Sequence, residues 1–183
     1  MENRDNLINF VGFPKIARLS RDIIISEKID GTNASVIIDE DGTVAAASRT
    51  RLITPEDDNF GFARWVKDHE EELLIGLGIG RHFGEWWGGK IQRGYGLKEK
   101  RFSLFNVSQW NAENKPGCCE VVPTLYIGLF DTEVIKAILE DLAAGGSVAA
   151  PGFMDPEGIV IYHTAARVMF KKTIRGDEKG KGE

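Results

Sequence analysis

The seven residues EKIDGTN, at positions 27–33, determine how the surrounding chain is interpreted. They place the amine of Lys28 directly before a tight polar turn at Asp30 and Gly31, where polar groups can surround a phosphate. Residues 22–28, which lead into the turn, are rich in isoleucine and predict a short strand. Lysine, one further residue and Asp-Gly form a weak pattern by themselves, because a solvated lysine beside a turn gives the same letters.

The segments around this stretch predict a fold that is rich in strands. Residues 33–38 and 43–48 flank the sequence DEDG at 39–42, a hairpin signal because glycine accepts the positive φ that such turns need. Further strands are predicted at 82–87, 101–107 and 121–130, and a second hairpin at 158–162 and 168–174.

Two helices are predicted from apolar residues at a spacing of 3.6. The first begins after the capping residues 57–59, and its apolar face carries Phe62, Trp65, Val66, His69 and Leu73. The second is capped by Asp131 and stopped by glycines at 145–146. Many strands, few helices and hairpin connections together predict the α+β fold class, with antiparallel sheets and flanking helices.

The composition narrows the class of protein. The chain has 183 residues, 42% of them hydrophobic and 28% charged, which is typical of one globular domain. No apolar run reaches the ~18 residues of a membrane helix and the N-terminus is polar, so we expect a cytoplasmic protein with no membrane partner. A net charge of −5 excludes a uniformly basic coat, but Lys and Arg outnumber Asp and Glu over 81–101 and 167–183.

Five further motifs follow EKIDGTN. They are SRTR at 48–51, FGEW at 83–86, FSLFNV at 102–107, PEGIV at 156–160 and FKKT at 170–173. In this order the six resemble the motifs of the covalent nucleotidyltransferases, the superfamily of ATP-dependent ligases and mRNA capping enzymes. EKIDGTN, together with GEW in the third motif, is most similar to the RNA ligase 2-type branch.

The resemblance implies an ATP-grasp-like nucleotidyltransferase (adenylation) domain over residues 1–175, followed by a disordered tail at 176–183. It also implies an ATP-dependent RNA ligase that uses ATP with Mg²⁺ or Mn²⁺ and acts on RNA ends, nicked or single-stranded. In the implied reaction Lys28 takes AMP with release of pyrophosphate and passes it to an RNA 5′-phosphate. A 3′-hydroxyl then attacks that activated end and seals the strand.

Lys28, Arg49 and Lys171 are the catalytic residues that the resemblance implies. A free lysine has a pKa of ~10.4, so its amine needs desolvation or neighbouring cations to become neutral and nucleophilic. Arg49, Lys171 and Lys172 would supply such cations and would also neutralise the triphosphate. Many relatives have Lys-x-Lys in the last motif, so Lys171 is the closer match, and either Lys172 or Thr173 replaces the second lysine.

The resemblance also implies residues that contact the nucleotide and the metal. Glu27 would lie near the base, Phe105 would stack on adenine and Glu85 would hold the ribose hydroxyls. Asn33 would lie near the transferred phosphate or the incoming RNA end, and Glu157 would bind or orient the metal. The residues alone leave alternatives open. Phe105 also fits a position in the hydrophobic core, Glu157 could be an ordinary turn residue, and Asn33 could simply close the turn after Lys28.

Two other functions stay open on the sequence. One is a GTP-dependent guanylyltransferase of the capping type, and the other is a non-catalytic module that binds RNA ends. Ligases of this branch usually carry a C-terminal domain that helps to engage RNA, whereas about ten residues follow FKKT here. We therefore expect a minimal ligase that relies on an accessory RNA-binding partner.

Overall fold

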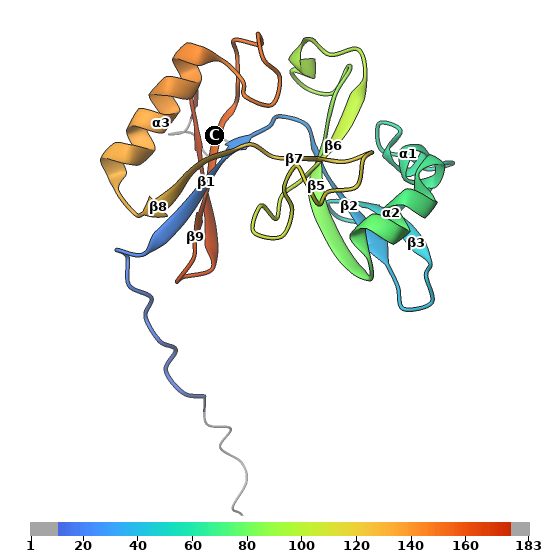
Figure 1. Cartoon of the computed structure of the whole chain (residues 1–183), viewed down its shortest axis with the longest axis horizontal. Helices are drawn as coiled ribbons and strands as arrows, with labels where there is room; N and C mark the ends of the chain where they lie inside the picture. Colours follow the sequence, from blue (N-terminus) through green and yellow to red (C-terminus); the bar gives the residue numbers. More distant parts are fainter. Residues whose placement is uncertain (1–10, 177–183) are drawn as a thin grey trace, which may run out of the picture.

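Two β-sheets form the frame of the molecule, and a computed structural model describes them within residues 11–176 (Figure 1). The four-stranded sheet has the order β10-β9-β1-β8, with β1 at Asp22–Lys28, β8 at Thr124–Leu129, β9 at Gly158–His163 and β10 at Val168–Thr173. The six-stranded sheet has the order β4-β3-β2-β5-β6-β7, with β2 at Thr32–Ile38, β3 at Val44–Ser48, β4 at Leu52–Ile53, β5 at Gly80–Gly88, β6 at Lys100–Leu104 and β7 at Glu120–Val121.

Helix α3 (Thr132–Gly145) covers one face of the four-stranded sheet (Figure 1). Ile23 and Ile25 of β1 are fully buried, while Ile24 between them points to the other side of the sheet. The cluster around these two isoleucines contains Ile135 and Leu142 of α3 with Ile159 and Ile161 of β9. This packing fixes which face of β1 is left for Lys28.

Helices α1 (Phe62–Asp68) and α2 (Glu70–Leu77) cover the six-stranded sheet in the same way. Phe62 is fully buried, and its ring centroid lies 5.4 Å from that of Trp86 in β5 and 5.0 Å from that of Phe102 in β6. Aromatic pairs of this kind add ~0.5–1.5 kcal/mol beyond the area that they bury. Because side chains alternate along β5, Trp86 packs toward the helices and Glu85 lies on the opposite face of the sheet, where it is also buried.

A third buried cluster lies where the two sheets meet. It contains Ile29, Trp87, Tyr95, Val122 and Ala150. Ile29 belongs to the short link between β1 and β2, and Tyr95 belongs to the 3₁₀ turn η1 (Gly94–Gly96) that follows β5. The cluster therefore anchors the turn that comes directly after Lys28.

The predicted α+β fold class is confirmed, and the helix predicted after residue 59 is two helices instead of one. His69 separates them with φ −116° and ψ 18°, and its Nδ1 atom lies 2.8 Å from the carbonyl oxygen of Trp65. Three glutamates open α2 immediately afterwards, where negative charge favours the start of a helix. These glutamates therefore favour the start of a second helix directly after the break at His69.

The strand predicted at 121–130 is likewise divided, because β7 and β8 belong to different sheets. Pro123 lies between them and has no N–H to donate to a ladder. Its carbonyl oxygen accepts a backbone hydrogen bond of 2.9 Å from Glu27. β7 also pairs with β6 in parallel, whereas every other strand pair in the described part of the chain is antiparallel as predicted.

The second predicted helix, α3, has the expected ends. The Oδ1 atom of Asp131 accepts a hydrogen bond of 2.8 Å from the backbone N–H of Glu133, and Gly146 stops the helix with φ 83°. Over residues 11–176, no helix is both long and apolar enough to cross a membrane. Apart from Gly176, the predicted tail at 176–183 lies outside the described residues.

The cap of α3 gives a first testable prediction. Asp131→Ala should lower the free energy of unfolding by about 1 kcal/mol, because the first turn of α3 loses its side-chain acceptor. Asp131→Asn keeps an acceptor oxygen and should cost much less. Urea-induced unfolding of the three proteins measures this difference, and equal losses for the two variants would contradict the capping role.

Candidate functional site

Lys28 and Glu157 form an ion pair although 129 residues separate them. Lys28 ends β1, and its register partner in β9 is Gly158, the residue after Glu157. The Nζ atom of Lys28 donates to Oε2 of Glu157 at 2.5 Å, and the two side chains are 24% and 17% exposed. The pairing of β1 with β9 thus brings the predicted nucleophile and the predicted metal-binding carboxylate into direct contact.

Lys171 shares the face of Lys28, and Lys172 does not. Gly158 lies opposite Lys28 in β1 and opposite Thr173 in β10. Alternate residues of a strand point to the same side, so Lys171 and Thr173 point to the side of Lys28, while Lys172 points to the α3 side. Of the two adjacent lysines in FKKT, the register therefore places Lys171 on the same face of the sheet as Lys28.

The Glu27 carboxylate binds the loop that follows α3, and its predicted role near the base stays a prediction. Glu27 precedes Lys28 and therefore points to the α3 side, where it is 1% exposed. One carboxylate oxygen accepts from the Ser147 hydroxyl at 2.6 Å, and the other accepts from the backbone N–H groups of Val148 and Ala149 at 2.9 Å each. The structure uses the Glu27 carboxylate to hold the loop after α3 and does not join it to the Lys28 cluster.

Glu85 and Asn33 lie directly opposite each other in β5 and β2. The Nδ2 atom of Asn33 donates to Oε2 of Glu85 at 3.0 Å, and the backbone N–H of Gly31 donates to Oε1 at 3.0 Å. Gly31 is required here because a Cβ atom would lie 2.5 Å from the carbonyl oxygen of Trp86. The turn after Lys28 is thereby held against a buried carboxyl of the other sheet.

Burial raises the pKa of Glu85 to about 7. The hydrogen bond from Asn33 and the positive charge of Lys28 oppose this rise, and the negative charge of Glu157 adds to it. Lys28 and Glu157 therefore act on Glu85 across the space between the two sheets. Near neutral pH the carboxyl is poised between its two protonation states, so its capacity to accept hydrogen bonds from hydroxyl groups depends on pH.

Phe105 lies outside the three buried clusters and is 39% exposed, which removes the core position that the sequence left open. Its backbone N–H donates to the carbonyl oxygen of Phe83 at 3.0 Å, so the β5–β6 ladder continues to this point. Phe83 is 58% exposed and lies two residues before Glu85, on the same face. Two exposed aromatic rings thus border the Glu85 side of the site.

Arg49 makes no side-chain bond to these residues, and its predicted role toward the phosphates stays a prediction. It lies in the turn between β3 and β4, it is exposed, and within residues 11–176 its side chain makes no hydrogen bond or ion pair. Two residues later, Arg51 forms a bidentate ion pair with Asp57, in which Nη1 and Nη2 lie 2.7 and 2.9 Å from the carboxylate oxygens. The structure thus joins Lys28 to Glu157 and Asn33 to Glu85, and it places Lys171 on the face of Lys28. Arg49 directly follows Ser48, which lies opposite Ala34, the neighbour of Asn33.

Arg93 is a further residue of the site, and the sequence interpretation did not single it out. It lies in the glycine-rich loop after β5, and its guanidinium contacts Asp30 and the backbone that precedes Glu157. In the sequence, Arg93 is only a basic residue between Gly89 and Gly94, and no spacing rule connects it to Asp30.

The carboxylates fit a metal ion that arrives with a polyphosphate. The described residues contain no group of three or more His, Cys, Asp or Glu side chains suited to hold a metal. Mg²⁺ is commonly held by one or two carboxylates together with substrate phosphates. Glu157 and Glu85 match that pattern, because they are carboxylates close to the Lys28 amine.

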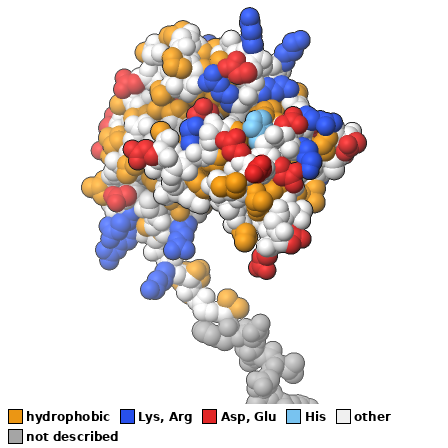
Figure 2. Space-filling model, turned by 45° about the vertical axis from the view of Figure 1, so that its right-hand side comes forward, with side chains coloured by type: hydrophobic (Ala, Val, Ile, Leu, Met, Phe, Trp, Pro, Cys, Tyr) orange, Lys and Arg blue, Asp and Glu red, His pale blue; other side chains and the backbone are white. Residues whose placement is uncertain are grey.

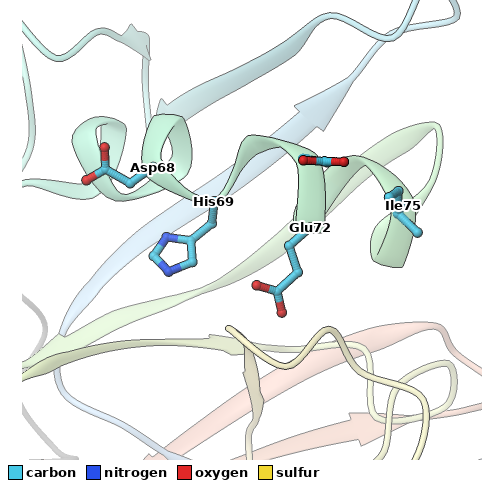
Figure 3. A pocket seen from close by; sticks show the side chains of 5 residues that line it. Asp68, His69, Glu72 and Ile75 are labelled. Carbon is cyan, nitrogen blue, oxygen red and sulfur yellow. The ribbon is translucent and has the colours of Figure 1, made fainter.

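Two other surface features lie apart from the Lys28 cluster. Figure 3 shows a pocket on α1 and α2 that is lined by Asp68, His69, Glu72 and Ile75, and no predicted site residue belongs to it. On the face seen in Figure 2, Lys and Arg side chains are interspersed with Asp and Glu.

The raised pKa of Glu85 gives a prediction about stability. Wild-type protein should lose stability between pH 4.5 and 7, because the folded state disfavours the charged carboxylate that the unfolded chain forms freely. Glu85→Gln cannot ionise, so its free energy of unfolding relative to wild type should rise with pH by up to about 3 kcal/mol. Urea-induced unfolding of both proteins at several pH values tests this, and a pH-independent difference would contradict the raised pKa.

Comparisons with known proteins identify the family and the fold of this chain. A family model described as RNA ligase matches residues 21–173. A search of curated proteins found no match. Among solved structures, two Naegleria gruberi RNA ligase mutants with ATP and Mn match with 21% and 22% identity, each at a TM-score of 0.61. They cover 84% and 86% of this chain and 49% and 51% of their own.

Naegleria gruberi RNA ligase with PPi matches with 22% identity and a TM-score of 0.59, covering 84% of this chain and 50% of its own. The chain thus spans about half the length of the solved structures that it matches, and at this identity they establish the fold. The family model covers most of the chain, from the start of β1 to the end of β10. The chain belongs to the RNA ligase family.

Proposed function

We propose that this chain is an ATP-dependent RNA ligase that joins RNA 5′-phosphate and 3′-hydroxyl ends through a lysyl-AMP. The observation that carries the proposal is the contact between the Lys28 amine and Glu157, with Lys171 on the same face. The family match over residues 21–173 supports it, and it also supports treating residues 1–175 as one adenylyltransferase domain.

In the first step the Lys28 amine loses a proton and attacks the α-phosphorus of ATP. A P–N bond forms, the bond to the β-phosphate oxygen breaks and pyrophosphate leaves. Glu157 is positioned to accept the proton, because its carboxylate already holds the amine at 2.5 Å. Lys171 would stabilise the negative charge on the phosphates, and Arg49 and Lys172 are retained as weaker candidates for that role.

In the later steps an oxygen of the RNA 5′-phosphate attacks the phosphorus of AMP, the P–N bond breaks and Lys28 is released. The 3′-hydroxyl then attacks the activated RNA phosphate, and AMP leaves. Mg²⁺ or Mn²⁺ would supply Lewis-acid stabilisation of the phosphates, with Glu157 as its protein ligand. The Naegleria gruberi RNA ligase structures with ATP and Mn support ATP and a divalent metal for this chain.

We assign the nucleotide contacts to the face of the six-stranded sheet that lies opposite α1 and α2. Phe105 would stack on adenine, and Glu85, held by Asn33, would accept hydrogen bonds from the ribose hydroxyls. Asn33 is exposed and can also face the RNA end. Glu27 would act near the base through the loop that its carboxylate holds. RNA ends, with help from an accessory RNA-binding partner, are the proposed substrate.

The covalent step is tested directly by intact-protein mass spectrometry after incubation with Mg²⁺ and either ATP or GTP. We expect the mass of one adenylyl group to be added with ATP and no adduct with GTP. Lys28→Arg keeps the charge but cannot readily supply a neutral amine, so this variant should form no adduct. A wild-type amount of adduct in Lys28→Arg, or a guanylyl adduct in wild type, would overturn the proposal.

The two adjacent lysines of β10 provide a matched pair of variants. Lys171→Ala should slow lysyl-AMP formation at saturating ATP by on the order of 10²–10³-fold, since it removes one preorganised charge from the reacting side. Lys172→Ala removes the same charge from the opposite face and should have a much smaller effect. Single-turnover labelling with radioactive ATP measures both rates, and a larger loss for Lys172→Ala would show that the face assignment is wrong.

A further inference from the structure

We propose that Arg93 is a positioning residue that holds the turn after Lys28 against the segment before Glu157, and so aligns the lysine for adenylylation. This inference rests on the proposed function. Arg93 lies in the loop after β5, a strand of the six-stranded sheet. Lys28 ends β1 and the segment before Glu157 leads into β9, and both of these strands belong to the four-stranded sheet. The residue would therefore act across the junction between the sheets.

The guanidinium of Arg93 bonds to both segments at once. Its Nε atom donates to Oδ2 of Asp30 at 3.0 Å. Its Nη1 atom donates to the carbonyl oxygens of Asp155 and Pro156, at 2.7 and 3.2 Å. The side chain is 26% exposed, so these charge-assisted bonds are partly shielded from water.

The two segments that Arg93 joins end at the reacting pair. Asp30 follows Lys28 by two residues, and Pro156 directly precedes Glu157. A shift of either segment would change the separation between the Lys28 amine and the Glu157 carboxylate. A planar guanidinium can serve both segments with fixed geometry, whereas a lysine ammonium is a single point charge.

The loop that carries Arg93 is itself strained and tightly held. Gln92 and Tyr95 have φ values of 46° and 50°, which cost ~1–3 kcal/mol each for residues other than glycine and persist only where the surroundings impose them. Tyr95 is buried, and its hydroxyl oxygen accepts a hydrogen bond of 2.8 Å from the backbone N–H of Asp30. The loop therefore binds Asp30 at two points: Tyr95 bonds to its backbone N–H, and Arg93 bonds to its carboxylate.

A second ion pair extends the connection to β10. The Asp155 carboxylate lies 3.2 Å from Nη1 of Arg93 and 3.2 Å from Nη2 of Arg175, two residues after the end of β10. The strand that carries Lys171 is thus linked to the same set of charges. Arg93 is the member of this set that reaches both the turn after Lys28 and the segment before Glu157.

The first test measures the single-turnover rate of lysyl-AMP formation as a function of ATP concentration. Arg93→Ala should lower the rate at saturating ATP by on the order of 10²-fold, because a small misplacement of reacting groups costs about that much. The ATP concentration for half-maximal rate should change little, since Arg93 makes no bond to Glu85 or Phe105. Arg64→Ala, which removes an exposed arginine from α1, is the matched control and should react like wild type.

Arg93→Lys keeps the positive charge and should form lysyl-AMP more slowly than wild type, because a lysine ammonium cannot bond to both segments with fixed geometry.

Thermal unfolding of each variant is measured alongside the rates. A folded Arg93→Ala that reacts at the wild-type rate would overturn the inference. If Arg93→Ala does not fold, the test rests on Arg93→Lys. A wild-type rate of lysyl-AMP formation in Arg93→Lys would overturn the inference, and so would failure of Arg93→Lys to fold.

A second readout does not depend on ATP. The rate at which a small amine-acylating reagent labels Lys28 is followed by peptide mass spectrometry. Glu157→Gln frees the amine and should speed labelling, and Arg93→Ala should speed it too, while Arg64→Ala should not. Absence of lysyl-AMP in wild type would refute the proposed function alone, whereas unchanged Lys28 labelling in Arg93→Ala would refute the positioning role alone.

Discussion

The contact between Lys28 and Glu157 depends on the register of β1 against β9. In that register Lys28 lies opposite Gly158, and the residue before Gly158 is the carboxylate that binds the lysine amine. A slip of one residue would turn Lys28 to the α3 side of the sheet, because the side-chain period of a strand is two. The slip is prevented by the isoleucines of both strands, such as Ile25 and Ile159, which are fully buried against α3. The hydrophobic core of this sheet thus also determines the face on which Lys28 lies.

The six-stranded sheet places a buried carboxyl group, that of Glu85, near Lys28 and Glu157. Glu85 is buried within it, yet its pKa of about 7 reflects the charges of Lys28 and Glu157 as well as its own desolvation. The two sheets are coupled at the turn after Lys28, where Gly31 bonds to Glu85 and Ile29 belongs to the cluster at the sheet junction. Interactions among charges in such a partly dry site are stronger than in water. A change in the turn would therefore alter both the position of the Lys28 amine and the protonation of the Glu85 carboxyl.

The parts of this arrangement that sequence could predict are those encoded locally. Alternation and turn residues predicted most strands, and the motif order predicted the family. Lys28, Glu85 and Glu157 follow from motifs only a few residues long. The face of Lys171 required the pairing of three strands, which no local pattern contains. The contacts of Arg93 required a loop to reach across the junction of the sheets.

The central claim is that ATP reacts on the face shared by Lys28, Glu157 and Lys171. A crystal structure of the chain with Mg²⁺ and α,β-methylene ATP, which cannot release pyrophosphate, tests this most directly. The account predicts an α-phosphorus next to the Lys28 amine, with Lys171 contacting the phosphates and the adenine stacked on Phe105. A nucleotide bound on the α3 side of the sheet, with its phosphates at Lys172, would contradict it.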